Sequence, residues 1–96
     1  MPAAARVGDS TLPHGPWGGG SLTSGSGDVL INGIPASRVG DSGTPHPHPK
    51  EPPHGNSVSG GSSTVLINGI PAARVGDPMD CGSTIGSGSS TVIIGG

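Results

Sequence analysis

A phrase of nearly constant sequence occurs three times in this chain of 96 residues. Its copies are Pro2-Ala-Ala-Ala-Arg6-Val-Gly-Asp9, Pro35-Ala-Ser-Arg38-Val-Gly-Asp41 and Pro71-Ala-Ala-Arg74-Val-Gly-Asp77. The three arginines are separated by 32 and 36 residues, a period that is typical of a supersecondary unit. The chain is therefore expected to fold as three equivalent units.

A β-favouring run accompanies each phrase, but the run for the first phrase stands at the other end of the chain. Asp28-Val-Leu-Ile-Asn-Gly33 precedes the second phrase, Thr64-Val-Leu-Ile-Asn-Gly69 precedes the third, and Thr91-Val-Ile-Ile-Gly-Gly96 is C-terminal. We expect the two ends to meet, so that three units surround an axis. The prediction is a single domain over residues 1–96, with phrases at 2–9, 28–41 and 64–77 and with the strand 91–96 completing the first repeat.

Each unit is expected to contain a β-hairpin. The apolar runs end in Asn32-Gly33 and Asn68-Gly69, and Asn-Gly is typical of a type I′ turn, which needs positive φ at both central residues. Segments 10–27, 42–63 and 78–90 are rich in Gly, Ser and Pro, show no helical periodicity and are predicted to be long loops. The expected fold class is all-β with pseudo-threefold symmetry.

The hydrophobic core of such a chain is expected to be thin. The sequence has 20 glycines, 11 prolines and one aromatic residue, a composition that leaves little to bury. Its apolar residues are clustered and its net charge is only −2, which argues against disorder. Because Cys81 is the sole cysteine, a disulfide within the chain is excluded. A bound metal is the remaining device that would stabilise so small a core.

Candidate metal ligands stand at equivalent places after the three phrases. His14 and His46 each follow the last Asp of their phrase by five residues, and Cys81 follows by four. His54 lies in a Pro-His-Gly sequence like that around His14 and completes a set of four. Three imidazoles and one thiolate suit tetrahedral zinc. We predict one structural zinc ion bound by His14, His46, His54 and Cys81.

Two alternatives stay open for these ligands. His48 stands two residues after His46 and competes with it, although His48 falls off the repeat register and is more simply an exposed histidine. Cys81 taken alone is more often a small buried residue than a ligand.

Charge, hydropathy and the repeated polar residues argue against several functions. No segment approaches the roughly 18 apolar residues of a membrane-spanning helix, and the start of the chain lacks a secretory signal, so cytoplasmic residence without stable membrane insertion is expected. Four basic and six acidic residues give no reason to expect nucleic-acid binding. Each phrase places Arg three residues before Asp, a symmetric pattern that favours structural ion pairs over catalysis.

The repeated phrase resembles the signature of the PAAR-repeat proteins. The resemblance covers essentially the whole chain and is most complete in Val-Leu-Ile-Asn-Gly-Ile-Pro-Ala-Ala-Arg-Val-Gly-Asp at residues 65–77. It implies a small conical β protein that caps the blunt end of a trimeric VgrG-type spike in a bacterial type VI secretion system. It also implies a zinc ion near the pointed vertex, held by His and Cys residues that correspond to His14, His46, His54 and Cys81.

Three departures from the pattern bear on these expectations. The first phrase has an extra Ala between Pro2 and Arg6, the second has Ser37 in place of an Ala, and the segment 45–54 is longer than its counterparts. They leave open the register of the first hairpin and the choice between His46 and His48. No sequence remains for a fused toxin, so effector proteins are expected to travel on another chain or on the spike.

The expected function is a structural, non-enzymatic spike tip, present in one copy per trimer, that resides in the cytoplasm before it is delivered into a target cell. A free-standing zinc-binding module or carrier is the alternative, and a small hydrolase is disfavoured because four protein ligands leave the metal no open position. The hairpins are expected to contact the spike while the metal lies at the opposite end. We expect the apolar positions of the hairpins to be divided between the core and the contact with the spike. These positions are Val29, Ile31, Ile34, Val65, Ile67, Ile70, Val92 and Ile94.

Overall fold

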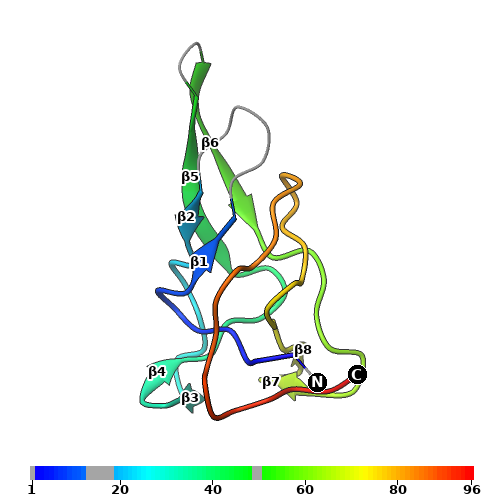
Figure 1. Ribbon diagram of the computed structural model, residues 1–96. Helices are drawn as coiled ribbons and strands as arrows, with labels where there is room; N and C mark the ends of the chain where they lie inside the picture. The colour runs from blue at the N-terminus through cyan, green and yellow to red at the C-terminus, as the bar shows by residue number, and fades with distance from the viewer. Residues whose placement is uncertain (1, 13–18, 49–50) are drawn as a thin grey trace.

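The computed structural model of the chain describes residues 2–12, 19–48 and 51–96, and the side chains of these residues except 45–48 and 51–55. Within this part the secondary structure is all-β, which confirms the predicted fold class, and none of it forms a helix long and apolar enough to cross a membrane. The molecule is elongated, 39 × 24 × 21 Å, and tapers from a broad end that carries both termini to a narrow end at the tip of one hairpin (Figure 1).

Four antiparallel strand pairs make up the regular structure. Two short hairpins lie at the broad end and two others rise toward the narrow end (Figure 1). The pairs are β1 (Ser10–Thr11) with β2 (Gly20–Ser21), β3 (Leu30–Ile31) with β4 (Ile34–Pro35), β5 (Ser42–His48) with β6 (Glu51–Ser57), and β7 (Leu66–Ile67) with β8 (Ile70–Pro71).

The turns of the two broad-end hairpins are of the predicted kind. Asn32 and Gly33 have φ values of 54° and 77°, and Asn68 and Gly69 have 55° and 76°. Positive φ at both central residues defines the type I′ turn, whose twist matches that of the flanking strands. The Asn-Gly prediction is confirmed at both sites.

The chain ends form the third broad-end unit, with a single bridge in place of a regular strand pair. Ala3 bridges to Ile93, and the Ile94 N–H donates to the carbonyl of Pro2 at 2.9 Å. Ala3 therefore occupies the position of Pro35 in β4, which pairs with Leu30. The extra alanine shifts Pro2 one place outward and leaves Arg6 in register with the other two arginines.

A closed triangle of backbone hydrogen bonds joins the three phrases at the axis. The Ser37 N–H donates to Ala5 O at 3.1 Å, Ala73 N–H donates to Ser37 O at 3.0 Å, and Ala5 N–H donates to Ala73 O at 3.0 Å. All three residues are fully buried. Three backbones approach this closely only where the side chains are small, so the Ala-Ala and Ala-Ser positions of the phrase are set by space at the axis.

Two thin apolar layers lie on either side of this triangle. The layer on the broad side combines three alanines with three isoleucines that project inward from the hairpins, and its members are Ala4, Ala36, Ala72, Ile31, Ile67 and Ile94. The layer on the narrow side contains Leu22, Val58 and Ile85, one from each repeat, together with Met79. The core is therefore built from stacked triplets along the axis, without aromatic residues among the described positions.

A buried serine marks the start of each broad-end unit. The hydroxyls of Ser26, Ser62 and Ser89 each accept a hydrogen bond from a backbone N–H three residues later, at 2.8–2.9 Å. Glycine precedes each serine, and a Cβ on Gly25, Gly61 or Gly88 would lie 2.6–2.7 Å from the carbonyl oxygen of an alanine in the broad-side layer. The Gly-Ser pair is thus a further repeated element of the chain, and it was not among the features predicted from the sequence.

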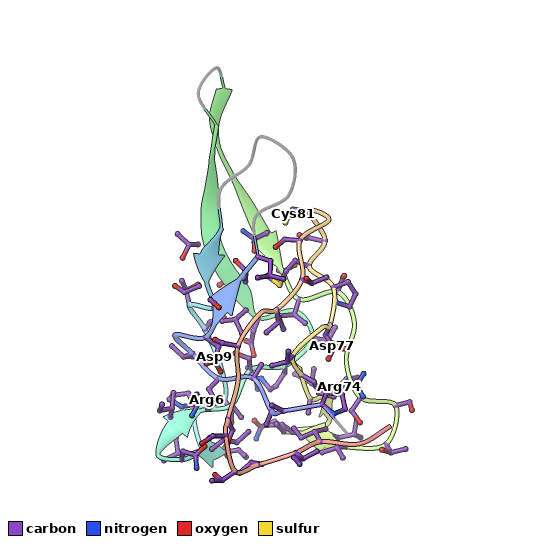
Figure 2. All side chains as sticks on the ribbon, in the orientation of Figure 1. Arg6, Asp9, Arg74, Asp77 and Cys81 are labelled. Atoms are coloured by element: carbon purple, nitrogen blue, oxygen red, sulfur yellow. The ribbon has the colours of Figure 1, made fainter. Side chains whose placement is uncertain are left out.

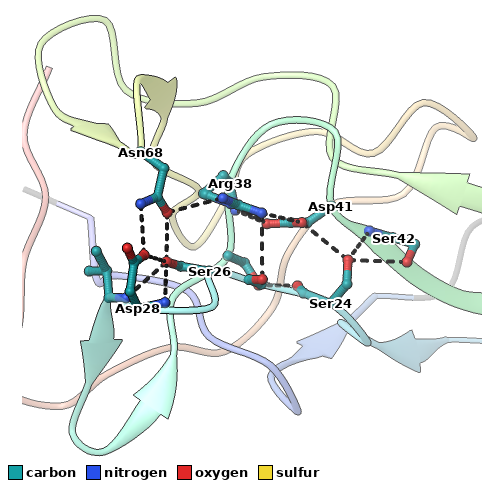
Figure 3. Close-up of polar contacts among 10 residues, drawn as sticks. Ser24, Ser26, Asp28, Arg38, Asp41, Ser42 and Asn68 are labelled. Atoms are coloured by element: carbon teal, nitrogen blue, oxygen red, sulfur yellow. Dashed lines mark hydrogen bonds and ion pairs between the residues drawn. The ribbon is translucent and has the colours of Figure 1, made fainter.

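Polar side chains seal the boundary between neighbouring repeats. At the boundary shown in Figure 3, the Asn68 Oδ1 accepts from both Ser26 Oγ, at 2.6 Å, and Arg38 Nη1, at 3.1 Å. Asn32 Oδ1 accepts from Ser89 and Arg6 in the same way. At the third boundary the carbonyl of Gly95 replaces the amide and accepts from Ser62 and Arg74.

The prediction of a loop over residues 42–63 is wrong for most of its length, because β5 and β6 form the longest hairpin among the described residues. Its prolines tolerate extended backbone but remove N–H donors, which weakens every sequence signal for a strand. The pairing is irregular as a result, with register shifts between Gly43 and His46 and between His46 and His48. Residues 10–11 and 20–21 of the predicted first loop are likewise strands.

The substitution Gly25→Ala should destabilise the fold, because the new Cβ would stand 2.7 Å from the backbone oxygen of Ala36, which cannot move aside at the buried axis. We expect a loss of about 1–3 kcal/mol, the usual effect of overpacking. Gly27→Ala is the matched control, since a Cβ there meets nothing within 4 Å. Thermal denaturation of both variants decides the point, and equal melting temperatures would contradict the proposed crowding at the axis.

Candidate functional site

Each phrase ends in an ion pair between its own arginine and its own aspartate. In the second repeat, Arg38 donates from its backbone N–H and from Nε to Asp41 Oδ2, at 2.8 and 2.9 Å, and from Nη2 to Oδ1 at 3.2 Å. Arg6 with Asp9 and Arg74 with Asp77 repeat these three contacts (Figure 2). The expected structural ion pairs are thus present, and we call them the Arg–Asp clamps.

The hydrogen bonds of the clamps shift the pKa of Asp41 and of the three arginines. Burial opposes ionisation of the Asp41 carboxyl, but the hydrogen bonds and charge of Arg38 outweigh it and lower the pKa of Asp41 below its ordinary value. The hydrogen bond to the partner carboxylate in turn raises the pKa of each guanidinium. Arg38 and Asp41 therefore both stay charged at neutral pH, which holds this clamp in place.

The clamps stand at the feet of three segments that rise toward the narrow end. The first segment runs through β1 and β2, the second is the β5–β6 hairpin, and the third is the shorter stretch that bears Cys81 (Figures 1 and 2). Leu22 bridges to Gly43, Val58 bridges to Met79, and Thr11 bridges to Ile85. Backbone bridges therefore join each segment to both of the others. The three segments form a closed ring, as the three phrases do at the axis.

Of the four predicted zinc ligands, His46 and His54 lie on the second segment and Cys81 lies on the third. His14 lies outside the described residues, and the structure describes the backbones but not the side chains of His46 and His54. The β5–β6 register pairs His46 directly with His54, whereas His48 pairs with Glu51. The register thus sets the backbones of the two predicted ligands His46 and His54 opposite each other.

Cys81 is the one predicted ligand whose side chain is described. It is half-buried and packs against the narrow-side layer. Asp80, which precedes it, accepts hydrogen bonds from Ser57 of β6. Among the described side chains no three His, Cys, Asp or Glu residues gather into a metal cluster, and the three predicted imidazole ligands lie outside those side chains.

A second candidate site lies at the opposite, broad end. Leu30, Leu66 and Ile93 occupy equivalent positions in the three units and are 58–59 % exposed. They alternate with the buried Ile31, Ile67 and Ile94, so they project from the face turned away from the core. We call these three side chains the base triplet.

The base triplet corrects part of the sequence analysis. The expected division of Val29, Ile31, Ile34, Val65, Ile67, Ile70, Val92 and Ile94 between core and contact surface omitted the three positions that are most exposed. The isoleucines at 31, 67 and 94 belong to the core, and Val65, at 36 %, is the most exposed of the eight. The two-residue period of a strand puts the central residue of each run, 29–31, 65–67 and 92–94, on the face opposite its neighbours, but the runs are apolar throughout, so the sequence does not tell which face is buried.

These features define a small structural β domain, with a symmetric apolar face at one end and a tapering, His- and Cys-bearing end at the other. The PAAR motif family matches residues 8–87 of the chain, and the chain therefore belongs to that family. Its members are structural proteins of the spike tip in type VI secretion systems, and they generally associate with VgrG spikes. No curated protein matches the chain.

Proposed function

We propose that this protein is the structural tip of a type VI secretion spike, and that it caps one VgrG-type trimer with its broad end. The observation that carries the proposal is the base triplet, in which one large apolar side chain from each repeat is more than half exposed at an equivalent position. An exposed apolar set with threefold symmetry fits a partner with threefold symmetry. One copy of the pseudo-threefold chain then matches three identical spike chains.

The cyclic framework supports this role because it makes the base rigid. The axial triangle and the hydrogen bonds from the three arginines to Asn32, Asn68 and Gly95 tie each unit to its neighbours, and no unit has a core of its own. A preorganised surface loses little conformational entropy when it docks. Force applied along the axis would be shared among three equivalent connections.

At the narrow end we propose one structural zinc ion, bound by His14, His46, His54 and Cys81. The donor set fits zinc, the β5–β6 register pairs two of its members, and Cys81 stands on the neighbouring segment. Four protein ligands would fill the coordination sphere, so the ion would stabilise the tapering end and leave no position for a substrate. This arrangement argues for a tip and against a hydrolase.

The same proposal covers partners and location. The protein assembles on its spike in the cytoplasm and leaves with it when the apparatus fires, together with effector proteins carried by other chains or by the spike. A free-standing zinc carrier is the alternative, but it gives no reason for three equivalent apolar side chains to be exposed at the end remote from the proposed metal.

Introducing charge into the base triplet should prevent capping. Leu66→Glu is expected to weaken association with the cognate trimeric spike by more than tenfold, because an unpaired carboxylate would be buried in the interface. Leu12→Glu is the control, since Leu12 is 48 % exposed but lies on the segment that rises toward the narrow end. Pull-down with purified spike measures both variants, and retention of Leu66→Glu at the parent level would refute the docking face.

Purified protein should contain one zinc ion per chain by elemental analysis.

Substitution of the proposed ligands should destabilise the fold. Cys81→Ser should lower the melting temperature by about 10 °C or more, because loss of the metal removes folding energy and the melting temperature of a domain of this size shifts by about 4–8 °C for each kcal/mol lost. His48→Ala should be milder than His46→Ala, since the ladder pairs His46 with His54. A protein prepared without chelator that holds no zinc would rule out the metal site, and the reverse order of the two histidine variants would reassign the ligand.

A further inference from the structure

We infer that Asp80 is a positioning residue for Cys81, and that it sets the distance between the thiolate and the β6 strand that carries His54. This inference rests on the zinc site proposed above. It concerns a side chain that neither the sequence motif nor the ligand set includes.

The contacts of Asp80 hold two chain segments in a fixed relation. Ser57 donates from its backbone N–H to Asp80 Oδ1 at 3.0 Å and from Oγ to Oδ2 at 2.9 Å. In return the Asp80 N–H donates to the carbonyl of Ser57 at 2.8 Å. Three hydrogen bonds between one pair of residues fix both separation and orientation, and we call this set the Asp80 clasp.

The clasp lies between the two proposed ligands along the chain. Asp80 is bonded covalently to Cys81, and Ser57 is three residues beyond His54 on the same strand. The buried Met79 anchors the other side of Asp80 and bridges to Val58. Cys81 belongs to a short turn outside any named strand, and the clasp joins that turn to the ligand-bearing hairpin.

The other two boundaries between segments are joined by hydroxyls, by backbone groups and by the carboxylates of Asp41 and Asp9, which accept from Ser24 and Ser87. The first segment and the β5–β6 hairpin are joined by hydroxyls, with Ser21 and Thr44 3.3 Å apart. The Cys81 segment meets the first segment through the Leu12 N–H, which donates to Thr84 O at 2.8 Å, and through Ser83 Oγ, which donates to Leu12 O. Asp80 stands at the boundary between the segment that bears Cys81 and the strand that bears His54.

Metal affinity depends on such positioning, because outer residues that orient ligands typically change it by about 10–100-fold when they are removed. Asp80→Ala removes both side-chain contacts and should weaken zinc binding by about tenfold or more. Asp80→Asn should restore affinity to within about threefold of the parent, since the amide can accept from the Ser57 N–H and donate to its Oγ. Rescue by an uncharged residue separates positioning from electrostatic attraction to the cation.

The experiment measures zinc dissociation constants by competition with a chromophoric chelator, and the thiolate-to-metal absorption band of the cobalt(II)-loaded protein. Asp80→Ala should show weaker zinc binding and a diminished or shifted band, and Ser57→Ala should fall between it and the parent. Asp28→Ala is the matched control, because Asp28 also accepts two side-chain hydrogen bonds, from Ser26 and Asn68, but at the broad end. It should bind zinc as the parent does.

Two results would overturn the inference. Parent-like affinity and absorption in Asp80→Ala would show that the clasp does not position Cys81, and equal loss in Asp80→Asn and Asp80→Ala would assign the effect to charge. If Asp80→Ala does not fold, Ser57→Ala and Asp80→Asn still discriminate. Absence of zinc and of a cobalt–thiolate band in the parent would instead refute the proposed metal site itself.

Discussion

The triangle of backbone hydrogen bonds among Ala5, Ser37 and Ala73 is the constraint on which the rest of the structure depends. It brings three segments from distant parts of the chain onto one axis, where nothing larger than alanine or serine fits. Each repeat contributes only a thin share of the apolar layers, so no repeat could be stable without the other two. The Arg–Asp clamps and the Gly-Ser pairs reinforce a closure that the triangle defines.

Cyclic closure also explains why the two ends of the molecule differ in chemistry. At the broad end the three units are alike, and their exposed side chains form a symmetric apolar face suited to a trimer. Toward the narrow end the segments differ in length and sequence, and their bonds to one another replace a core. A metal ion would supply there the stability that apolar burial cannot, since a tapering tip has little interior.

The sequence predicted the parts of this fold that rest on local chemistry. Asn32-Gly33 and Asn68-Gly69 specify their turns through backbone preference alone. The repeated spacing of Arg and Asp indicates the ion pairs. The β5–β6 hairpin escaped prediction because its prolines obscure strand propensity and its pairing partner is set by tertiary context. The base triplet was missed because exposure of Leu66 depends on which face the assembled ring buries, a property of the whole molecule.

The central claim is that closure at the axis makes folding a single cooperative event that includes the N-terminal phrase. Amide hydrogen exchange, followed by NMR on the purified protein, tests it directly at the three bonds of the triangle. The amides of Ala5, Ser37 and Ala73 should share the slowest exchange and report one free energy, that of global unfolding. Exchange at Ala5 that is much faster than at Ser37 and Ala73 would contradict the claim, because it would show that the first phrase opens while the other two remain folded.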